Sequence, residues 1–332
     1  MLQLLICLFP SFIQVPIRRL LGARIGKRSK IRLGTILKYN HLIIDENVSI
    51  GPFCYIQGHD ISIGSNTLVR PLTILIAHTI KLGQYVHIAP SAVIKGDSNF
   101  NQSFFEVGDH SRIFPFCWLE PGQGIRIGKH VGIGGHTLIF THGVWPDYLK
   151  NGPVSFGAVI LEDNVWLPWR VFILPNVTIG HDSIIGGGSI VNRSIPANSL
   201  AGGIPARVIK EGIGNPLTIE DKMARSCEIL ASYVDYCNQK GFEWHYKIEN
   251  NTIVCDHCIS IDSMEHLRSG DILFAVNRNL TDTEIKMLLE KNIAIICHSR
   301  LTAYSKAYSR HISEFVKFLR RYGIRMYISR VI

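Results

Sequence analysis

The chain has 332 residues, and its 46% hydrophobic and 18% charged content excludes an intrinsically disordered protein and leaves room for two domains. The net charge of +9 indicates an anionic partner; because the sequence shows no aromatic-plus-basic motif of a nucleic-acid-binding module, we favour a phosphorylated cofactor. The eight cysteines follow neither a disulfide framework nor zinc-site spacing, which predicts a reduced cytoplasmic compartment and no bound metal.

Residues 1–24 form an apolar segment that Pro10 and Pro16 interrupt. It has neither the basic start nor the small-residue cleavage site of a signal peptide, and the prolines argue against a membrane span. We therefore expect a short helical segment. Two interpretations are open: the segment packs on the first coil of the following domain, or it rests as an amphipathic segment on the inner face of a membrane.

Residues 25–210 repeat with a step of six. A helix would bring apolar residues back after three or four positions, and a half-buried strand would alternate. A step of six predicts straight runs separated by turns, with one aliphatic side chain inward on each side, as in the hexapeptide parallel β-helix. The repeat is most regular where aliphatic residues lie at strict intervals: Leu167, Ile173, Ile179, Ile185 and Val191.

The six-residue register breaks at residues 57–62, 97–104, 120–124 and 143–158. We expect each break to be a loop outside the coil, because repeat proteins place insertions on the surface. The longest break, 143–158, contains turn-forming residues and the aromatic residues Trp145 and Tyr148. Loops of this size within a regular repeat are commonly functional.

Residues 211–332 follow a different pattern, which predicts a small α/β domain of unassigned role. Residues 218–240 have apolar positions at helical spacing, and Thr281 and Glu284 form the capping box of a second helix. Alternation of strands with helices predicts a parallel sheet. The other expected elements are strands at 271–277, 293–297 and 325–328, and a helix at 311–322.

The segments VWLPWRVFILPNVTIG and IIGGGSIVNRSIPANSLAGGIPARVIK resemble the closing coils of hexapeptide-repeat O-acyltransferases. This group includes the galactoside and maltose acetyltransferases, and the resemblance covers residues 25–210. It implies a mostly β fold, a left-handed parallel β-helix, and a homotrimer with sites between neighbouring subunits. The implied reaction moves acetyl from acetyl-CoA to a hydroxyl of a sugar or polysaccharide precursor, in surface-polysaccharide assembly.

His142 is the candidate catalytic base. It opens the pattern HGVWPDYLKNG…SF…DNVW, which resembles HxVxxxxxKNG…SF…NNVW of the galactoside enzymes, where this histidine is the base. A hydroxyl is a poor nucleophile near neutral pH, whereas imidazole has an ordinary pKa near 6.5 and can accept its proton. A loop histidine without catalytic duty is the competing interpretation.

Three residues are candidates for binding the acceptor: Glu120, Trp145 and Asp147. Carboxylates accept hydrogen bonds from sugar hydroxyls, although Glu120 can equally be a solvated loop residue. The galactoside enzymes use an asparagine near the region where this chain has residues 113–115, Ile-Phe-Pro. Their specific acceptor is therefore not transferred to this chain.

The resemblance also implies a binding site for the cofactor along the closing coils. Trp166 would form an apolar wall, and Gly187 would let the backbone approach the pantetheine arm. Basic residues would meet the phosphates. The matching positions are Trp166, Trp169, Gly187, Asn192, Arg193, Arg207 and Lys210.

One departure concerns Leu167-Pro168, where the family has Ile-Gly. Trp169 keeps the backbone N–H that would donate to the oxyanion. Its ring, however, narrows the expected cofactor channel, so the identity of the transferred acyl group is left open. An inactive scaffold is therefore an alternative, and CoA binding would distinguish it.

Two other activities are open. An amino sugar would lead to N-acylation. A zinc carbonic anhydrase of the gamma type would need three histidine ligands gathered between subunits, and zinc analysis would detect it. Its candidate ligands are His87, His110, His136 and His142.

Overall fold

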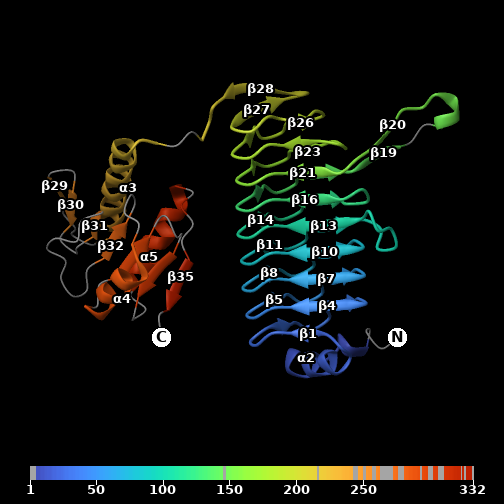
Figure 1. Cartoon of the computed structure of the whole chain (residues 1–332), viewed down its shortest axis with the longest axis horizontal. Coiled ribbons are helices and arrows are strands. Elements are labelled where there is room, and N and C mark those ends of the chain that lie inside the picture. Colours follow the sequence, from blue (N-terminus) through green and yellow to red (C-terminus); the bar gives the residue numbers. More distant parts are fainter. Residues whose placement is uncertain are drawn as a thin grey trace. The chain divides into compact units, whose positions relative to one another are not determined.

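The computed structural model divides into two compact units, Met1–Asn215 and Pro216–Ile332, which are described separately (Figure 1). In the described part of the chain, no helix combines the length and the apolar character needed to cross a membrane. The structure describes residues 5–144, 147–214, 217–241, 246–249, 252–255, 259–261, 272–275, 280–291, 294–297, 302–305, 310–322, 324 and 327–330.

The first unit begins with helix α2 (Ser11–Leu20), which packs on the first coil. The Ser11 hydroxyl accepts a hydrogen bond from the Ile31 N–H at 2.9 Å, and the Gly34 N–H donates to the Cys7 carbonyl at 2.8 Å. These contacts confirm that the segment packs on the coil.

Residues 24–211 form a parallel β-helix of about nine turns, which confirms the predicted fold class. Each full turn adds one strand to each of three sheets. Sheet one contains β1 (Arg24–Ile25), β4 (His41–Ile44), β7 (Asp60–Ile63), β10 (Thr79–Leu82), β13 (Phe104–Val107), β16 (Ile125–Ile127), β21 (Val159–Leu161) and β24 (Thr178–Ile179). Sheet two contains β2 (Lys30–Ile31), β5 (Ser49–Ile50), β8 (Leu68–Val69), β11 (His87–Ile88), β14 (Arg112–Ile113), β17 (Gly132–Ile133), β22 (Trp166–Leu167), β25 (Ile184–Ile185), β27 (Ser199–Gly203) and β28 (Ala206–Glu211). Sheet three contains β3 (Ile36–Lys38), β6 (Tyr55–Gln57), β9 (Ile74–Ile76), β12 (Val93–Lys95), β15 (Trp118–Glu120), β18 (Leu138–Phe140), β23 (Phe172–Ile173) and β26 (Ile190–Val191).

Three corners connect the sheets: the first corner joins sheet one to sheet two, the second joins two to three, and the third joins three to one. Many corner residues have left-handed backbone conformations, including Asn47 and Asn66 with φ values of 58° and 61°. Asparagine tolerates this region better than most residues. On the strands between the corners, the aliphatic residues predicted from the step of six point into the coil and are fully buried: Leu167, Ile173, Ile179, Ile185 and Val191.

The break at residues 57–62 is a regular corner of the coil. The prediction of a loop outside the coil at these residues was wrong. Leu42, Ile61 and Ile80 lie in register on neighbouring strands of sheet one, at intervals of 19 residues. A full turn here therefore holds one residue more than three hexapeptides, and the third corner takes up the extra residue. Residues 120–124 similarly make a turn, closed by a 3.0 Å hydrogen bond from the Gly124 N–H to the Pro121 carbonyl.

His87 on β11 makes the stability of the coil depend on pH. Burial, with Arg112 and Arg70 nearby, lowers the pKa of its imidazole to about 4, and its Nδ1 is buried without a hydrogen-bond partner. The unfolded chain, with a pKa near 6.5, binds the proton more readily. The contribution of the neutral His87 to the free energy of unfolding is therefore fully present above about pH 6.5. It is lost as the pH falls toward 4, because the unfolded chain takes up the proton first.

The free energy of unfolding should fall between pH 7 and pH 4, and we expect this fall to be smaller in His87→Gln than in the wild type by about 1–2 kcal/mol after allowance for solvent screening. Urea unfolding of both proteins between pH 7 and pH 4 measures the difference. Parallel curves of unfolding free energy against pH would show that His87 does not contribute.

In its described residues, the second unit contains three helices and a five-stranded sheet. The structure confirms the helix predicted at 218–240 and the capping box of Thr281 and Glu284. The helices are α3 (Ile219–Gln239), α4 (Asp282–Glu290) and α5 (Arg310–Leu319), followed by the 3-10 turn η2 (Arg320–Tyr322). The sheet order is β31 (Ile259–Ile261), β32 (Ile272–Ala275), β33 (Ala294–Cys297), β34 (Thr302–Ser305) and β35 (Tyr327–Arg330); β29 (Tyr246–Glu249) and β30 (Thr252–Cys255) form a hairpin.

The prediction of an entirely parallel sheet was wrong. Strands β33 and β34 pair antiparallel, and β34 is absent from the sequence prediction. Only residues 298–301 separate the two strands, whereas a parallel crossover needs a dozen or more residues. The short connection therefore forces the chain to reverse direction.

Candidate active site

The polar cluster around Glu120 and His142 lies at the third corner. Strand β15 ends at Glu120, and strand β18 in the next coil pairs with it so that Phe140 lies beside Glu120. Thr141 and His142 follow directly after β18. Stacking of two coils thus brings together side chains that are 22 positions apart in the sequence.

The Glu120 carboxylate holds the His142 ring. His142 Nδ1 lies 2.7 Å from Glu120 Oε2, which also accepts a hydrogen bond from the Thr141 hydroxyl at 2.9 Å. Glu120 Oε1 accepts from the Gly122 N–H at 2.8 Å. Because a carboxylate has no proton to give, Nδ1 donates and Nε2 is left as the ring's acceptor.

Solvent reaches the imidazole but only a small part of the carboxylate. The His142 side chain is 46% exposed and the Glu120 side chain is 14% exposed. Glu120 is therefore not a solvated loop residue, and its contact with His142 is one that the sequence did not predict. The arrangement supplies a proton acceptor, open to a substrate, on a fixed carboxylate.

A hairpin projects from the coil immediately after this cluster (Figure 1). Strand β19 (His142–Val144) pairs antiparallel with β20 (Val154–Phe156), and the 3-10 turn η1 (Tyr148–Lys150) lies between them. Asp147 caps η1 by accepting a hydrogen bond from the Leu149 N–H at 3.0 Å. Trp145, the other acceptor candidate of this loop, lies outside the described residues.

Two cofactor candidates lie at the same corner as His142. Strands β18, β23 and β26 are successive neighbours in sheet three, and the exposed residues Asn192 and Arg193 follow β26. Parallel strands are about 4.8 Å apart, which puts these residues roughly 10 Å along the coil from His142.

The second corner carries Trp169 and Gly187. A Cβ added to Gly187 would lie 3.4 Å from the Trp169 carbonyl oxygen, which is an ordinary van der Waals contact, so this corner has room for a small side chain. Within the described part of the chain, the Trp169 N–H makes no hydrogen bond, which leaves it able to bind an oxyanion. The Trp169 ring is half exposed and lies 5.7 Å from the His136 ring. His136 thus belongs to this corner and does not support His142.

The Leu167-Pro168 departure is accommodated by the coil. Leu167 fills an inward position and is fully buried. In the coil below, the Gly134 N–H donates to the Leu167 carbonyl at 2.6 Å, whereas Pro168 has no N–H with which to repeat this bond. The substitution therefore removes one hydrogen bond of the ladder and leaves the strand in place.

The remaining cofactor candidates belong to sheet two. Trp166 lies on β22, where a Cβ added to Gly132 would collide with its ring. Arg207 and Lys210 are exposed on β28, the last strand of the coil. Sheet two is opposite the third corner in a three-sided coil, so one chain does not bring these residues to His142.

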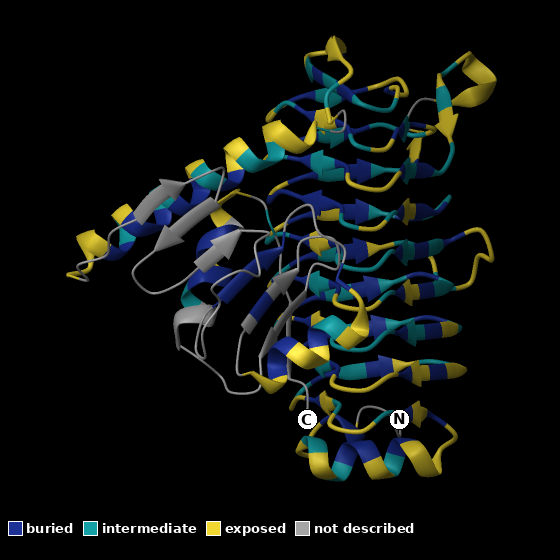
Figure 2. Ribbon diagram, turned by 60° about the vertical axis from the view of Figure 1, so that its left-hand side comes forward, coloured by how far each residue is buried: buried dark blue, intermediate teal, exposed yellow. Residues whose placement is uncertain are grey.

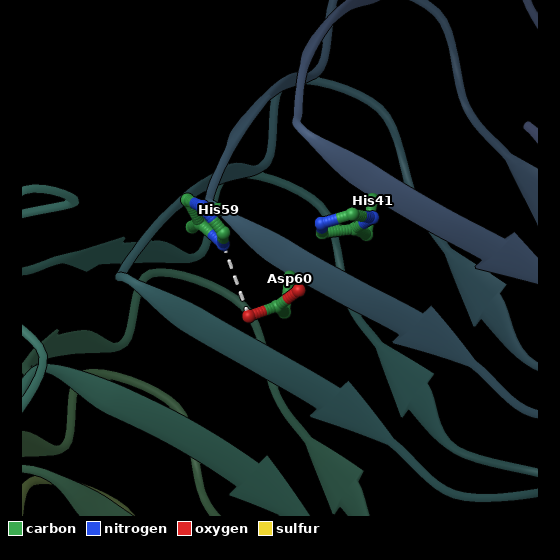
Figure 3. Close-up of side chains that lie close together, drawn as sticks. All are labelled: His41, His59 and Asp60. Carbon is green, nitrogen blue, oxygen red and sulfur yellow. Dashed lines mark hydrogen bonds and ion pairs between the residues drawn. The ribbon is translucent and has the colours of Figure 1, made fainter. Parts of the chain in front are cut away.

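A separate group, His41, His59 and Asp60, lies at the third corner near the start of the coil (Figure 3). The atoms that could bind a metal lie within 4.8 Å of one another, and His59 Nδ1 is 3.1 Å from Asp60 Oδ2. His41 and Asp60 are exposed and His59 is partly buried. Such surface groups form readily without a metal, so we assign no metal role to this one.

The four histidines of the carbonic anhydrase alternative lie at four different places around the coil. His87 is on sheet two, His110 at the first corner, His136 at the second and His142 at the third. Among the described residues, the His41 group alone has metal-binding spacing. One chain therefore does not assemble a three-histidine zinc site.

Known proteins resemble the coil. No model of a protein family matches the chain. The galactoside O-acetyltransferase of Escherichia coli K12 is 34% identical over 150 residues, which cover 39% of this chain and 74% of that protein. A putative acetyltransferase of Staphylococcus aureus strain COL is 37% identical over 157 residues, which cover 40% and 78% of the two chains.

The chain belongs to the hexapeptide-repeat acetyltransferases. It is an acetyl-CoA-dependent O-acetyltransferase. Among solved structures, a galactoside acetyltransferase in complex with coenzyme A is 27% identical, with a TM-score of 0.32, and the match covers 45% of this acetyltransferase and 64% of that chain.

Proposed function

We propose that this acetyltransferase acts on a hydroxyl of a sugar acceptor and that His142 is its general base. The observation that carries the proposal is the 2.7 Å contact between His142 Nδ1 and the Glu120 carboxylate. It fixes the tautomer whose free Nε2 can accept a proton. The sugar acceptor is supported by the name of the E. coli relative, a galactoside O-acetyltransferase.

In the proposed reaction, Nε2 takes the proton of the acceptor hydroxyl as its oxygen attacks the thioester carbonyl. The new C–O bond forms, the C–S bond breaks, and the sulfur leaves with the proton that His142 held. Glu120 stabilises the positive imidazolium between these two transfers, and proton transfer of this kind typically contributes about 10²–10⁴-fold. We propose the Trp169 N–H as the donor to the oxyanion.

We also propose that the enzyme is a homotrimer with the acetyl-CoA site between subunits. Support comes from the division of candidate residues between two sides of one coil. His142 and Arg193 lie at the third corner, whereas Trp166, Trp169 and Lys210 lie on sheet two or at the second corner. A rotational trimer can place the third corner of one subunit against the second corner of its neighbour, which completes the site.

The acceptor we propose is a unit of a surface polysaccharide or its precursor, acetylated in the cytoplasm. The exposed position of His142 on an outer corner leaves space for a large acceptor. A cytoplasmic location agrees with the thiols that the structure describes as free: Cys7, Cys54, Cys117, Cys227 and Cys237.

Thiol release from acetyl-CoA with a panel of sugars tests the reaction, with mass spectrometry of each product. We expect release that depends on a sugar, and an acetyl ester that mild alkali removes. An alkali-stable amide would establish N-acylation instead. Calorimetry with CoA distinguishes an active enzyme from an inactive scaffold, because the scaffold should give no heat of binding.

Arg193→Ala tests the phosphate site. The side chain is exposed and makes no ion pair within the described residues, so its removal should leave the fold intact. We expect the KM for acetyl-CoA to rise roughly 10- to 100-fold with kcat unchanged, because a hydrogen bond to a charged group contributes about 1.5–3 kcal/mol. Arg70→Ala, an exposed arginine on an early coil, is the matched control. Equal KM values in both variants would remove Arg193 from the cofactor site.

A further inference from the structure

Positive charge is concentrated in the first part of the chain. Eight of the 35 Lys and Arg residues precede Asp45, and none of the 26 acidic residues does. Residues 1–44 therefore carry eight of the nine net positive charges. Seven of these cations are exposed. Six of the seven lie on α2 or on residues 24–32 of the first coil, and none of the six makes an ion pair within the described residues: Arg19, Arg24, Lys27, Arg28, Lys30 and Arg32.

The outer face of α2 is apolar. Phe12, Pro16 and Leu20 follow one another at intervals of four and share a face; Phe12 is 76% exposed and Leu20 is 89% exposed. The buried face contains the polar residues Gln14 and Arg18 beside the apolar Val15. A surface helix of a globular protein usually has the opposite arrangement. Figure 2 shows the exposed residues along this helix at the N-terminal end of the coil.

Hydrogen bonds hold α2 in this orientation. The Gln14 side chain donates to the Phe9 carbonyl at 2.6 Å, and the Arg19 guanidinium donates to the Ile25 carbonyl at 2.6 Å. The bond from Ile31 to Ser11 fixes the start of the helix to the first coil. The helix cannot rotate its apolar face inward without breaking these bonds.

A groove of about 700 Å³ runs between α2 and the first coil. Phe12 and Pro16 line its helix side, and Lys30 and Arg32 line its coil side. The groove therefore combines apolar side chains with several cations, which matches an anionic lipid, whose acyl chain adjoins a negatively charged headgroup.

We propose that this cap surface docks on an anionic lipid bilayer. The cap surface comprises the outward apolar side chains of residues 5–20 together with the six exposed cations. Apolar insertion and electrostatic attraction act together in peripheral membrane proteins, and each Lys or Arg near an anionic surface contributes a binding factor of about five.

Docking would fix the distance between the proposed active site and the membrane surface. Five strand spacings separate β3 in the first coil from β18, which immediately precedes His142. At about 4.8 Å each, they place the base roughly 25 Å above the cap surface. This consequence rests on the proposed function, whereas the docking itself does not.

Vesicle co-sedimentation of the full chain tests the docking. We expect the protein to sediment with phosphatidylcholine vesicles that contain phosphatidylglycerol and to stay in solution with phosphatidylcholine alone. Raising the salt from about 0.05 M to about 0.5 M should release it, because screening shortens the reach of the charges. Equal binding to both kinds of vesicle, or to neither, would overturn the proposal.

Two double variants separate the contributions. Lys30→Glu with Arg32→Glu should lower binding at least tenfold, and Phe12→Ser with Leu20→Ser should lower it while leaving the charge intact. Lys95→Glu with Lys129→Glu changes the net charge equally, on later coils away from the cap surface, and should retain most binding. Circular dichroism checks the fold of each.

Two outcomes of the variant series would overturn the proposal. The first is an equal loss of binding in the Lys95 and Lys129 control. The second is a smaller assembly mass for the Phe12 and Leu20 variant, which would place another copy of the chain on this surface. Thiol release in solution should be unchanged in every variant, so failed docking and failed catalysis give different results.

Discussion

Replacing His142 with alanine lowers kcat for acetyl transfer by about 10²–10⁴-fold, because the acceptor hydroxyl loses its general base. The KM for acetyl-CoA stays close to the wild-type value, since the imidazole acts on the acceptor. The side chain is half exposed at the base of a projecting hairpin, so the melting temperature should change little. Thiol release under saturating substrates measures the effect.

The matched control for this substitution is His181→Ala. His181 also has its Nδ1 bonded to a carboxylate, with Asp182 Oδ2 at 2.8 Å, but it lies at the first corner. Its loss should leave kcat within about twofold of wild type, as expected for an exposed pair of little energetic value. If His142→Ala retains the activity of this control, another group must be the base.

Replacing Glu120 with glutamine lowers kcat by about 10²-fold or more and leaves the acceptor KM unchanged. The amide preserves the shape of the side chain, yet its NH₂ group can donate to Nδ1 and so stabilise the tautomer in which Nε2 carries the proton. That tautomer cannot accept the proton of the hydroxyl. The carboxylate that stabilises the imidazolium is also lost.

This variant distinguishes a positioning role from direct acceptor binding. If Glu120 bound the sugar, its loss would raise the acceptor KM with a smaller change in kcat. Glu106→Gln is the control, because Glu106 is also a poorly exposed carboxylate, paired with Lys81 at 3.0 Å and Arg126 at 2.9 Å on sheet one. Its kcat should match the wild type.

The hexapeptide repeat alone determined the coil of this protein. Each turn buries the same few positions, so a strict interval from Leu167 to Val191 identifies the fold without any knowledge of distant contacts. The motif beginning at His142 likewise located a candidate base. Such signals are local and repeated, and they survive in a single sequence.

The partners of these residues were decided by tertiary structure. The contact of His142 with Glu120 depends on the length of the intervening turn and on which side of the coil each strand ends. The antiparallel pairing of β33 with β34, and the separation of Trp166 from His142 across the coil, depend on chain geometry in the same way. Local sequence sets which side chains point inward, whereas the number of residues in each turn sets which of the outward ones meet.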